Sequence, residues 1–324
     1  MHGCRITWSL FIVTMRPGLT PWDFSDLSAR SLSRQAEIAE SLGYESFWLP
    51  ESHFIAGAIP DPLMLLASVA ATTRTLRLGT TSFLVPLRNP LQAAEQVAVL
   101  DRLSNGRVTL GIGRGYASAM LRAFDVAPRE KRARFEQNLQ AMLRAWKGEA
   151  VRPGNGGEAV VLDPLPVQQP HPPVWVAAFG PKALAQAGRL GMPYLASPME
   201  PVERLRANYE RHAVACGEAG VVVPPEVPVM RTVFVSDDAD LVARVREQLE
   251  IGAREVASSG LRRGLSLAPD DWAIVGGRSE VKDRVAAYVE ELGVTHLVVT
   301  RLRIGRVEPE ALERSVRLAA EVLG

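Results

Sequence analysis

LRLGTTSFLVPLRNPLQAAEQVAVLDRLSNGRVTLGIGRG, residues Leu76–Gly115, reads as a strand, a helix, a second strand and a glycine-spaced turn. The apolar, β-rich segment Leu76–Val85 predicts the first strand, and Val108–Ile112 predicts a short buried one. A strand–helix–strand unit of this size forms a right-handed parallel crossover. Two parallel strands therefore end side by side, where an α/β enzyme binds its cofactor.

The helix between the two strands has signals at both of its ends. Asn89 predicts the N-cap, and Pro90 is suited to the first helical position because its φ is fixed at a helical value. Asn105 and Gly106 predict an end in the left-handed conformation. We therefore expect a helix over Pro90–Leu103.

The turn after the second strand places one arginine among glycines. Gly111, Gly113 and Gly115 let the backbone come close to a ligand, and Arg114 supplies a cation. The pattern does not complete the dinucleotide fingerprint, because Tyr116 stands where the third glycine belongs. The turn predicts an anion site, with a surface ion pair as the alternative for the arginine.

Strand and helix patterns alternate along the whole chain. About eight strands, each followed by a helix, indicate a (β/α)8 TIM barrel with insertions at its C-terminal face, and a doubly wound sheet is the main alternative. The expected strands are Arg5–Val13, Ser46–Leu49, Leu76–Val85, Val108–Ile112, Val174–Ala178, Tyr194–Ala196, Val229–Val235 and His296–Thr300. The expected helices are Asp26–Leu42, Asp61–Thr73, Pro90–Leu103, Glu130–Trp146, Pro181–Leu190, Pro201–Ala219, Ala239–Ser258, Glu280–Leu292 and Glu308–Leu323.

Residues 1–324 are expected to form a single domain, with two segments that depart from the repeat. Gly148–Pro173 is rich in glycine and proline and predicts an irregular excursion or a small hairpin. Ser259–Gly277 predicts a loop after the seventh strand, on the catalytic face of a barrel, where it could act as a lid.

Composition excludes several classes of protein. The 37 basic and 36 acidic residues balance, which argues against nucleic acid or an anionic membrane as the main partner. Two cysteines without a CxxC pair indicate a reducing compartment. The apolar run Ile6–Val13 is too short to span a membrane and reads as strand rather than signal peptide. We expect a cytoplasmic protein.

The expected strand ends gather polar groups without the spacing of a metal site. They carry Glu51-Ser52-His53-Phe54, Thr80-Thr81-Ser82, Gly113-Arg114-Gly115, Phe179-Gly180 and Thr300-Arg301. Such a mixture suits a phosphate-bearing cofactor with a large planar ring better than metal hydrolysis. The five histidines are scattered, and neither a nucleophile elbow nor a P-loop occurs, so no metal site is predicted.

Four blocks of sequence resemble a known family. The blocks are GYESFWLPESHF, PDPLMLLASVAATTRTLRLGT, VPLRNPLQAAEQVAVLDRLSNGRVTLGIGRGY and PPVWVAAFGPKAL. In this order they are similar to the luciferase-like flavin monooxygenases, and the resemblance runs over most of the chain. It implies a TIM barrel that binds reduced FMN, or in one branch the deazaflavin F420, at the C-terminal face.

The resemblance also implies a cofactor site. Arg114 and Arg132 match arginines that contact the FMN phosphate, and the Gly180 amide at the start of a helix would add to them. Thr81-Ser82 falls where the family often has a non-proline cis peptide against the flavin ring.

The same comparison implies a catalytic group with one departure. Luciferases have Glu-His-His-Phe where this chain has Glu51-Ser52-His53-Phe54, so Ser52 occupies the position of the usual catalytic histidine. Glu51, at the edge of the pocket, Ser52 and His53 are therefore the catalytic candidates, with His53 taking over acid/base work from the next position.

Two further departures lie in the expected cofactor site. Luciferases have a reactive cysteine where Gly113 stands, and a glutamate where Phe179 stands. Light emission from a long-chain aldehyde is therefore not expected. The wall of the expected cofactor site at Phe179 is more apolar than in luciferases.

The resulting hypothesis is a monooxygenase that uses O2 and reduced FMN, supplied by a flavin reductase, to oxidise or hydroxylate a small organic substrate. One alternative is an F420-dependent oxidoreductase, whose anionic tail could be bound by Arg262, Arg263, Arg301 and Arg303. The other is a non-catalytic flavin-binding accessory protein. The resemblance also implies a homodimer.

Overall fold

Every pairing between strands is parallel in the part of the chain that the structure describes, as the unit around residues 76–115 predicts. The computed structural model describes residues 15–152, 154, 156–258, 268–302 and 304–324. The strands are β1 (Arg16–Leu19), β2 (Ser46–Leu49), β3 (Arg77–Thr80), β4 (Phe83–Leu84), β5 (Val108–Gly113), β6 (Val174–Ala177), β7 (Tyr194–Leu195), β8 (Pro228–Val235), β9 (Ala273–Gly276) and β10 (His296–Thr300).

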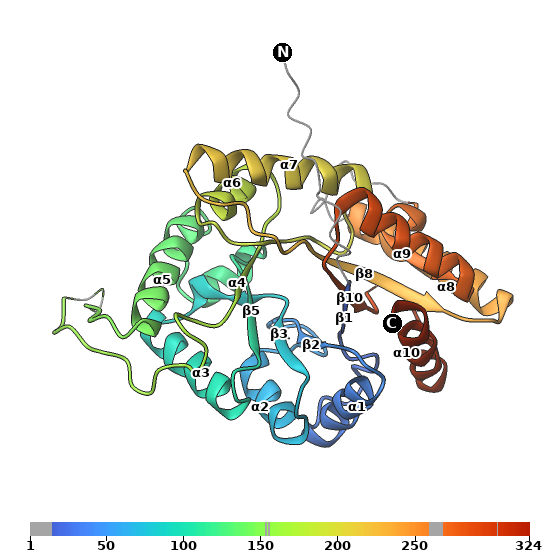
Figure 1. Cartoon of the computed structure of the whole chain (residues 1–324), viewed down its shortest axis with the longest axis horizontal. Coiled ribbons are helices and arrows are strands. Elements are labelled where there is room, and N and C mark those ends of the chain that lie inside the picture. Colours follow the sequence, from blue (N-terminus) through green and yellow to red (C-terminus); the bar gives the residue numbers. More distant parts are fainter. Residues whose placement is uncertain (1–14, 153, 155, 259–267, 303) are drawn as a thin grey trace, which may run out of the picture.

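Helices follow most strands and wrap the outer face of the sheet (Figure 1). They are α1 (Ala29–Ser41), α2 (Pro62–Thr72), α3 (Pro90–Leu103), α4 (Ser118–Ala123), α5 (Lys131–Trp146), α6 (Pro181–Arg189), α7 (Val202–Glu218), α8 (Ala239–Ser258), α9 (Arg278–Leu292) and α10 (Pro309–Leu323), with short 3-10 turns η1 (Val85–Leu87) and η2 (Pro269–Asp271).

The sheet curls through the order β7-β6-β5-β3-β2-β1-β10-β8-β9, and β4 pairs with β5. Ala196, directly after β7, forms an isolated parallel bridge with Val229 of β8, so β7 at one end of this order meets β8 near the other end. The predicted α/β class with a parallel sheet is confirmed, and the sheet is curled as a barrel requires.

Helix α3 has the predicted bounds because its end signals are local. The Asn89 side chain accepts hydrogen bonds from the backbone N–H groups of Leu91 (2.9 Å) and Gln92 (3.3 Å). At the other end Asn105 has φ 55° and Gly106 φ 78°, the left-handed conformation that stops the helix.

The sheet has apolar side chains on both faces. Phe47 and Leu49 of β2 belong to the large core beneath the helices, and Trp48 between them points to the inner face. There Trp48 stacks on Trp175 of β6 at 4.9 Å, in a cluster completed by Leu195, Met230 and Val298. Large side chains therefore fill the middle of the curled sheet.

The predicted strand Leu76–Val85 is wrong as a single strand, because it divides into β3 and β4 and ends in η1. Gly79 lies opposite Thr109, and Phe83 lies opposite Ile112. The four residues 80–83 that follow Gly79 therefore lie opposite only the three residues 110–112 that follow Thr109. The extra residue makes a bulge, and the peptide bond Thr81-Ser82 within it is cis, as predicted.

Other segments differ from the expected pattern. The predicted loop Ser259–Gly277 is wrong at its C-terminal end, because Ala273–Gly276 forms strand β9, which pairs with β8. Residues 259–267 of this predicted loop lie outside the described residues. The expected strand Arg5–Val13 also lies outside them, and the first described strand is Arg16–Leu19. Gly148–Pro173 contains the antiparallel bridge between Val151 and Val160, consistent with the predicted excursion.

Candidate functional site

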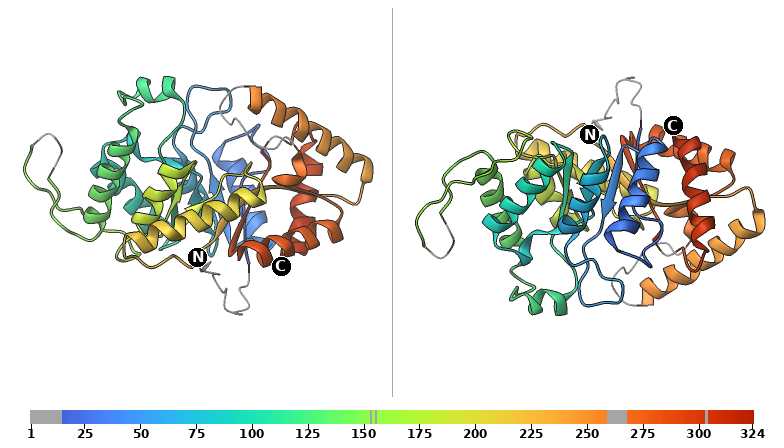
Figure 2. Two further views of the ribbon diagram at one scale, coloured as in Figure 1. Left: turned by 90° about the horizontal axis from the view of Figure 1, so that it is seen from above. Right: turned by 90° about the horizontal axis from the view of Figure 1, so that it is seen from below.

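The carboxyl ends of four neighbouring strands bring most of the predicted site residues to one edge of the sheet. Because β2, β3, β5 and β6 are adjacent and parallel, the segments that follow them emerge together. In both views of Figure 2, α4 and the loop after β2 project from the same face of the molecule. Two groups of charged side chains lie at this edge.

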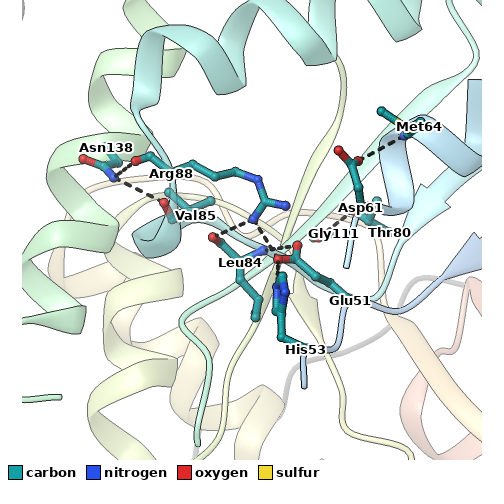
Figure 3. Close-up of polar contacts among 10 residues, drawn as sticks. All are labelled: Glu51, His53, Asp61, Met64, Thr80, Leu84, Val85, Arg88, Gly111 and Asn138. Atoms are coloured by element: carbon teal, nitrogen blue, oxygen red, sulfur yellow. Dashed lines mark hydrogen bonds and ion pairs between the residues drawn. The ribbon is translucent and has the colours of Figure 1, made fainter. Parts of the chain in front are cut away.

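The first group is built around the carboxylate of Glu51, whose side chain is fully buried (Figure 3). One oxygen accepts hydrogen bonds from His53 Nε2 and from Arg88 Nη1, both at 2.8 Å. The other oxygen accepts the backbone N–H of Leu84 at 2.9 Å. Because a carboxylate oxygen only accepts, Nε2 of His53 donates, which leaves Nδ1 as the nitrogen able to accept a proton.

Arg88 was missed by the sequence analysis and completes this group. Its guanidinium lies 3.9 Å from the centre of the Phe83 ring and also donates to the carbonyl of Leu84 at 3.1 Å. Asn138 of α5 donates to the carbonyls of Val85 and Arg88, at 3.2 and 3.0 Å. No local signal could reveal Arg88, because its partner Glu51 stands 37 residues earlier in the chain.

Ser52 closes the loop after β2. Its hydroxyl accepts the backbone N–H of Ile59 at 3.1 Å, and its own N–H donates to the Ile59 carbonyl at 2.9 Å. The loop therefore returns on itself beside Glu51 and His53. A catalytic role for any of these three residues stays a prediction.

The same loop carries aromatic side chains toward α4. The imidazole of His53 packs edge-on against Phe124 at 4.8 Å, and Phe54 stacks on Phe124 at 5.6 Å. Phe54 has φ 59°, which is rare for a bulky residue, and is 71% exposed. The exposed aromatic residues of the described chain all lie in loops after parallel strands: Phe24, Phe54, Tyr116 and Phe179.

The second charged group contains cations alone. Arg114, directly after β5, is buried and donates to the Gln186 side chain and to the carbonyl of Ala177, both at 2.7 Å. Its guanidinium also lies 5.1 Å from the ring centre of Phe135. Burial, together with the nearby charge of Arg132, lowers the pKa of Arg114 to about 10.

Lys131 joins Arg114 and Arg132, and the sequence analysis missed it. Its ammonium donates to the carbonyl of Gly115 at 2.9 Å. Burial lowers the pKa of Lys131, and the charges of Arg114 and Arg132 lower it further. The adjacent Arg132 was the signal that could have found it, but only the fold shows that its ammonium reaches the turn after β5.

No carboxylate forms an ion pair with these three cations in the described part of the chain. Glu136 is connected to Arg114 through the side chain of Gln186, which accepts a hydrogen bond from Arg114 and donates one to Glu136 at 2.8 Å. We call Arg114, Lys131 and Arg132 the cation cluster. Three cations held together without a counterion favour the binding of an anion, so this cluster is a candidate anion site.

The start of α6 adds backbone groups at the same corner. Gly180 is its N-cap with φ 87°, and no side chain caps the helix. A side chain at Gly180 would meet nothing within 4 Å, so the space in front of the helix is open. Phe179 beside it is 47% exposed. Arg114 donates to the carbonyl of Ala177, three residues before Gly180, so the N-terminus of α6 and the cation cluster lie together.

Several expectations concern other parts of the chain. Arg301 is buried and donates to the carbonyls of Val233 and Thr300, so it does not face an open site. Arg262, Arg263 and Arg303 lie outside the described residues. Where the chain is described, no helix is long and apolar enough to cross a membrane, and no group of three or more His, Cys, Asp or Glu could hold a metal ion.

Comparisons with known proteins agree on one family. The family model for luciferase-like monooxygenases matches residues 10–296. The oxygenase component of a flavin-dependent trigonelline monooxygenase from Acinetobacter baylyi is 30% identical over 215 residues, which are 63% of this chain and 58% of that protein. The chain spans 53 to 61% of the length of three curated relatives, this one included.

Two solved structures share the fold over 95% of this chain. The oxygenating constituent of 3,6-diketocamphane monooxygenase from Pseudomonas putida, in complex with FMN, has a TM-score of 0.81 at 20% identity and is covered to 97%. The coenzyme F420 dependent tetrahydromethanopterin reductase from Methanopyrus kandleri has a TM-score of 0.70 at 18% identity and is covered to 97%. With the family model matching most of its length, this chain belongs to the luciferase-like monooxygenase family.

Proposed function

We propose that this protein is the oxygenase of a flavin-dependent monooxygenase, using reduced FMN and O2 to oxidise a small organic substrate. The observation that carries the proposal is the cation cluster, which has no counterion in the described chain and lies at the carboxyl edge of the sheet. A phosphate group supplies the missing negative charge, and FMN brings such a group attached to a planar ring.

The residues around the cluster fit the two ends of such a cofactor. Arg114, Lys131 and Arg132 would bind the phosphate together with the backbone N–H groups of Gly180 and Lys182 at the start of α6. The ring would then lie toward Gly113, Thr81 and Ser82, at the ends of β5 and β3. When bound, reduced FMN would supply part of the electrons that reduce O2; the substrate, which takes up one oxygen atom, supplies the rest, and the other oxygen atom leaves as water.

Glu51 and Arg88 would orient the imidazole that handles a proton. With Nε2 of His53 donating to Glu51, the opposite nitrogen, Nδ1, is the atom that accepts or returns a proton. Arg88 holds the carboxylate from the other side, which fixes the imidazole in one orientation. His53 is therefore the proposed acid/base group, and Glu51 its positioning residue.

The exposed aromatic loops would cover an apolar substrate. Phe54 and Phe124 stack beside His53, Tyr116 follows Arg114 by two residues, and Phe179 directly precedes the N-cap of α6. Large apolar side chains kept exposed around one edge are typical of a ligand site. With substrate in place they would exclude water from the reacting atoms.

Four further parts complete the hypothesis. The meeting of β7 and β8 at Ala196 and Val229 supports a closed (β/α)8 barrel. The trigonelline enzyme is named as an oxygenase component, which supports a separate flavin reductase as partner. A homodimer and a cytoplasmic location are part of the same proposal.

The test offers the purified protein FMN and F420 separately and measures binding. It then measures O2 uptake and NADH use with FMN and a generic flavin reductase over a panel of apolar substrates. Binding of FMN and substrate-dependent O2 uptake support the proposal. Preference for F420 with hydride transfer from a donor would make it an F420-dependent oxidoreductase, and FMN binding without turnover of any substrate would make it an accessory protein.

A further inference from the structure

Arg114, the most deeply buried member of the cation cluster, is held by uncharged oxygen atoms. In the described chain it donates two hydrogen bonds, both 2.7 Å long, to the carbonyl of Ala177 and to Oε1 of the Gln186 side chain. Neither acceptor carries a charge, so both position the guanidinium without neutralising it. The amide at position 186 therefore affects the charge of the whole cluster.

Gln186 is a fully buried amide on α6, the helix whose N-terminus lies beside the cation cluster. Burying an amide costs free energy unless its polar atoms find partners. Here Oε1 accepts from Arg114, and Nε2 donates to the Glu136 carboxylate at 2.8 Å and to the backbone carbonyl of Arg132 at 3.5 Å. These partners determine which end of the amide faces Arg114, because a guanidinium only donates and a carboxylate only accepts.

The amide of Gln186 separates a buried cation from a carboxylate. Glu136, on α5, is exposed, so solvent screens its negative charge. The change Gln186→Glu would instead place a carboxylate where the amide oxygen now lies, 2.7 Å from Arg114, and burial would reduce the screening of that charge. Such a counterion would compete with an anionic ligand for Arg114.

We propose that Gln186 determines the charge selectivity of the flavin site, because its neutral amide holds Arg114 in place for the phosphate and keeps the carboxylate of Glu136 away from it. Gln186 is a positioning residue that acts through Arg114 and does not touch the ligand. The inference rests on the proposed function, since it takes the phosphate of FMN as the anion. The position of one negative charge among three hydrogen-bonded side chains then decides whether the site prefers FMN to riboflavin.

The decisive variant exchanges the amide and the carboxylate. Glu136→Gln combined with Gln186→Glu keeps the composition and net charge of the protein and moves the carboxylate next to Arg114. The new amide at position 136 can donate to the new carboxylate at position 186, so thermal unfolding should occur within about 3 °C of the natural protein. FMN affinity should fall about 10- to 100-fold, whereas riboflavin affinity should change less than about 2-fold. The ratio of the two affinities should also depend less on salt.

Three single variants separate the effect of charge from that of position. Gln186→Met removes the acceptor of Arg114 without adding a charge, and should weaken FMN binding only about 2- to 5-fold. Gln186→Glu alone introduces the same buried carboxylate as the exchange and should show the same selective loss of FMN binding. Gln140→Glu makes the same substitution at an exposed position of α5, and as the matched control it should change FMN affinity less than about 2-fold.

The outcomes separate this inference from the proposed function. Natural FMN affinity in the exchange variant, or an equal loss of FMN and riboflavin binding, would overturn the role of charge at position 186. Equal weakening of FMN binding by Gln186→Met and by the exchange would show that Gln186 acts only as a hydrogen-bond acceptor, which also overturns the inference. A natural protein that binds FMN no better than riboflavin would overturn the phosphate site itself, and with it both proposals.

Discussion

Two charged groups at the same edge of the sheet satisfy their charges in opposite ways. The carboxylate of Glu51 is fully buried and accepts from His53, Arg88 and the backbone of Leu84. The cation cluster holds Arg114 and its two neighbours together with no ion pair in the described chain. The first group pairs its charges within the protein, and the second has no paired carboxylate, as the proposed phosphate site requires.

This difference assigns different roles to the two groups. Hydrogen bonds to Glu51 connect the loop after β2 to the turn after β4, so the group stabilises the site's framework. Keeping the cation cluster charged costs free energy, because burial and the neighbouring positive charges lower the pKa values of Arg114 and Lys131. A bound phosphate would offset this cost, which is why we assign the cluster a role in binding.

The largest expected effect is on the complete group. Glu51→Ala removes the acceptor for three donors and leaves Arg88 without its carboxylate, so the free energy of unfolding should fall by about 3–5 kcal/mol. Denaturant unfolding measures it. Glu45→Ala, which breaks the exposed pair with Arg16, should cost no more than about 1 kcal/mol. Equal losses from the two variants would contradict a structural role for Glu51.

The corresponding change in the cation cluster should act on binding. Arg114→Met relieves its repulsion of Lys131 and Arg132 but leaves Gln186 and the Ala177 carbonyl without their donor, so the free energy of unfolding should fall by about 1–3 kcal/mol, less than for Glu51→Ala. FMN affinity should fall about 10- to 100-fold, the loss of a charge-assisted hydrogen bond. Arg129→Met, 87% exposed in its side chain and paired with Glu130, is the control in a fluorescence titration. Unchanged FMN affinity would remove Arg114 from the phosphate site.

Lys131 should make FMN binding depend on pH. Its pKa is lowered in the free protein, and a bound phosphate favours the charged form, so affinity should fall as pH rises, at pH values below the 10.5 of an ordinary lysine. Riboflavin has the same ring without phosphate, and the ratio of the two affinities isolates this effect. Lys131→Met should bind FMN about 10-fold more weakly at pH 8 and flatten the ratio. A ratio that rises with pH would contradict the assignment.

The smallest effect is expected at the exposed edge of the cation cluster. Arg132 is exposed, so solvent screens its charge, and Arg132→Ala should weaken FMN binding no more than about 5-fold. The loss should shrink further at high salt, whereas part of the Arg114 effect should persist because that side chain is buried. A larger effect at Arg132 than at Arg114 would reverse their roles in the site.

The sequence predicted what local chemistry determines. The bounds of α3 follow from Asn89, Pro90 and the Asn105–Gly106 end, all within or next to the helix. Arg114 was found because glycines surround it after a buried strand. In each case the deciding residues are neighbours in the chain.

What the sequence missed depends on distant pairing. The division of Leu76–Val85 into β3 and β4 arises from the register against β5, which no local pattern encodes. Arg88 and Lys131 became site residues only when the fold brought them to Glu51 and to Gly115. Strand β9 was hidden in a predicted loop because its partner β8 lies far earlier in the chain.

The central claim is that the cation cluster binds the phosphate of a flavin, and one titration tests it most directly. Dissociation constants of the natural protein for FMN and for riboflavin are measured in the same buffer at low and at high salt. FMN should bind about 100-fold more tightly than riboflavin at low salt, and the difference should narrow with added salt. Equal affinity for the two flavins at low salt would contradict it.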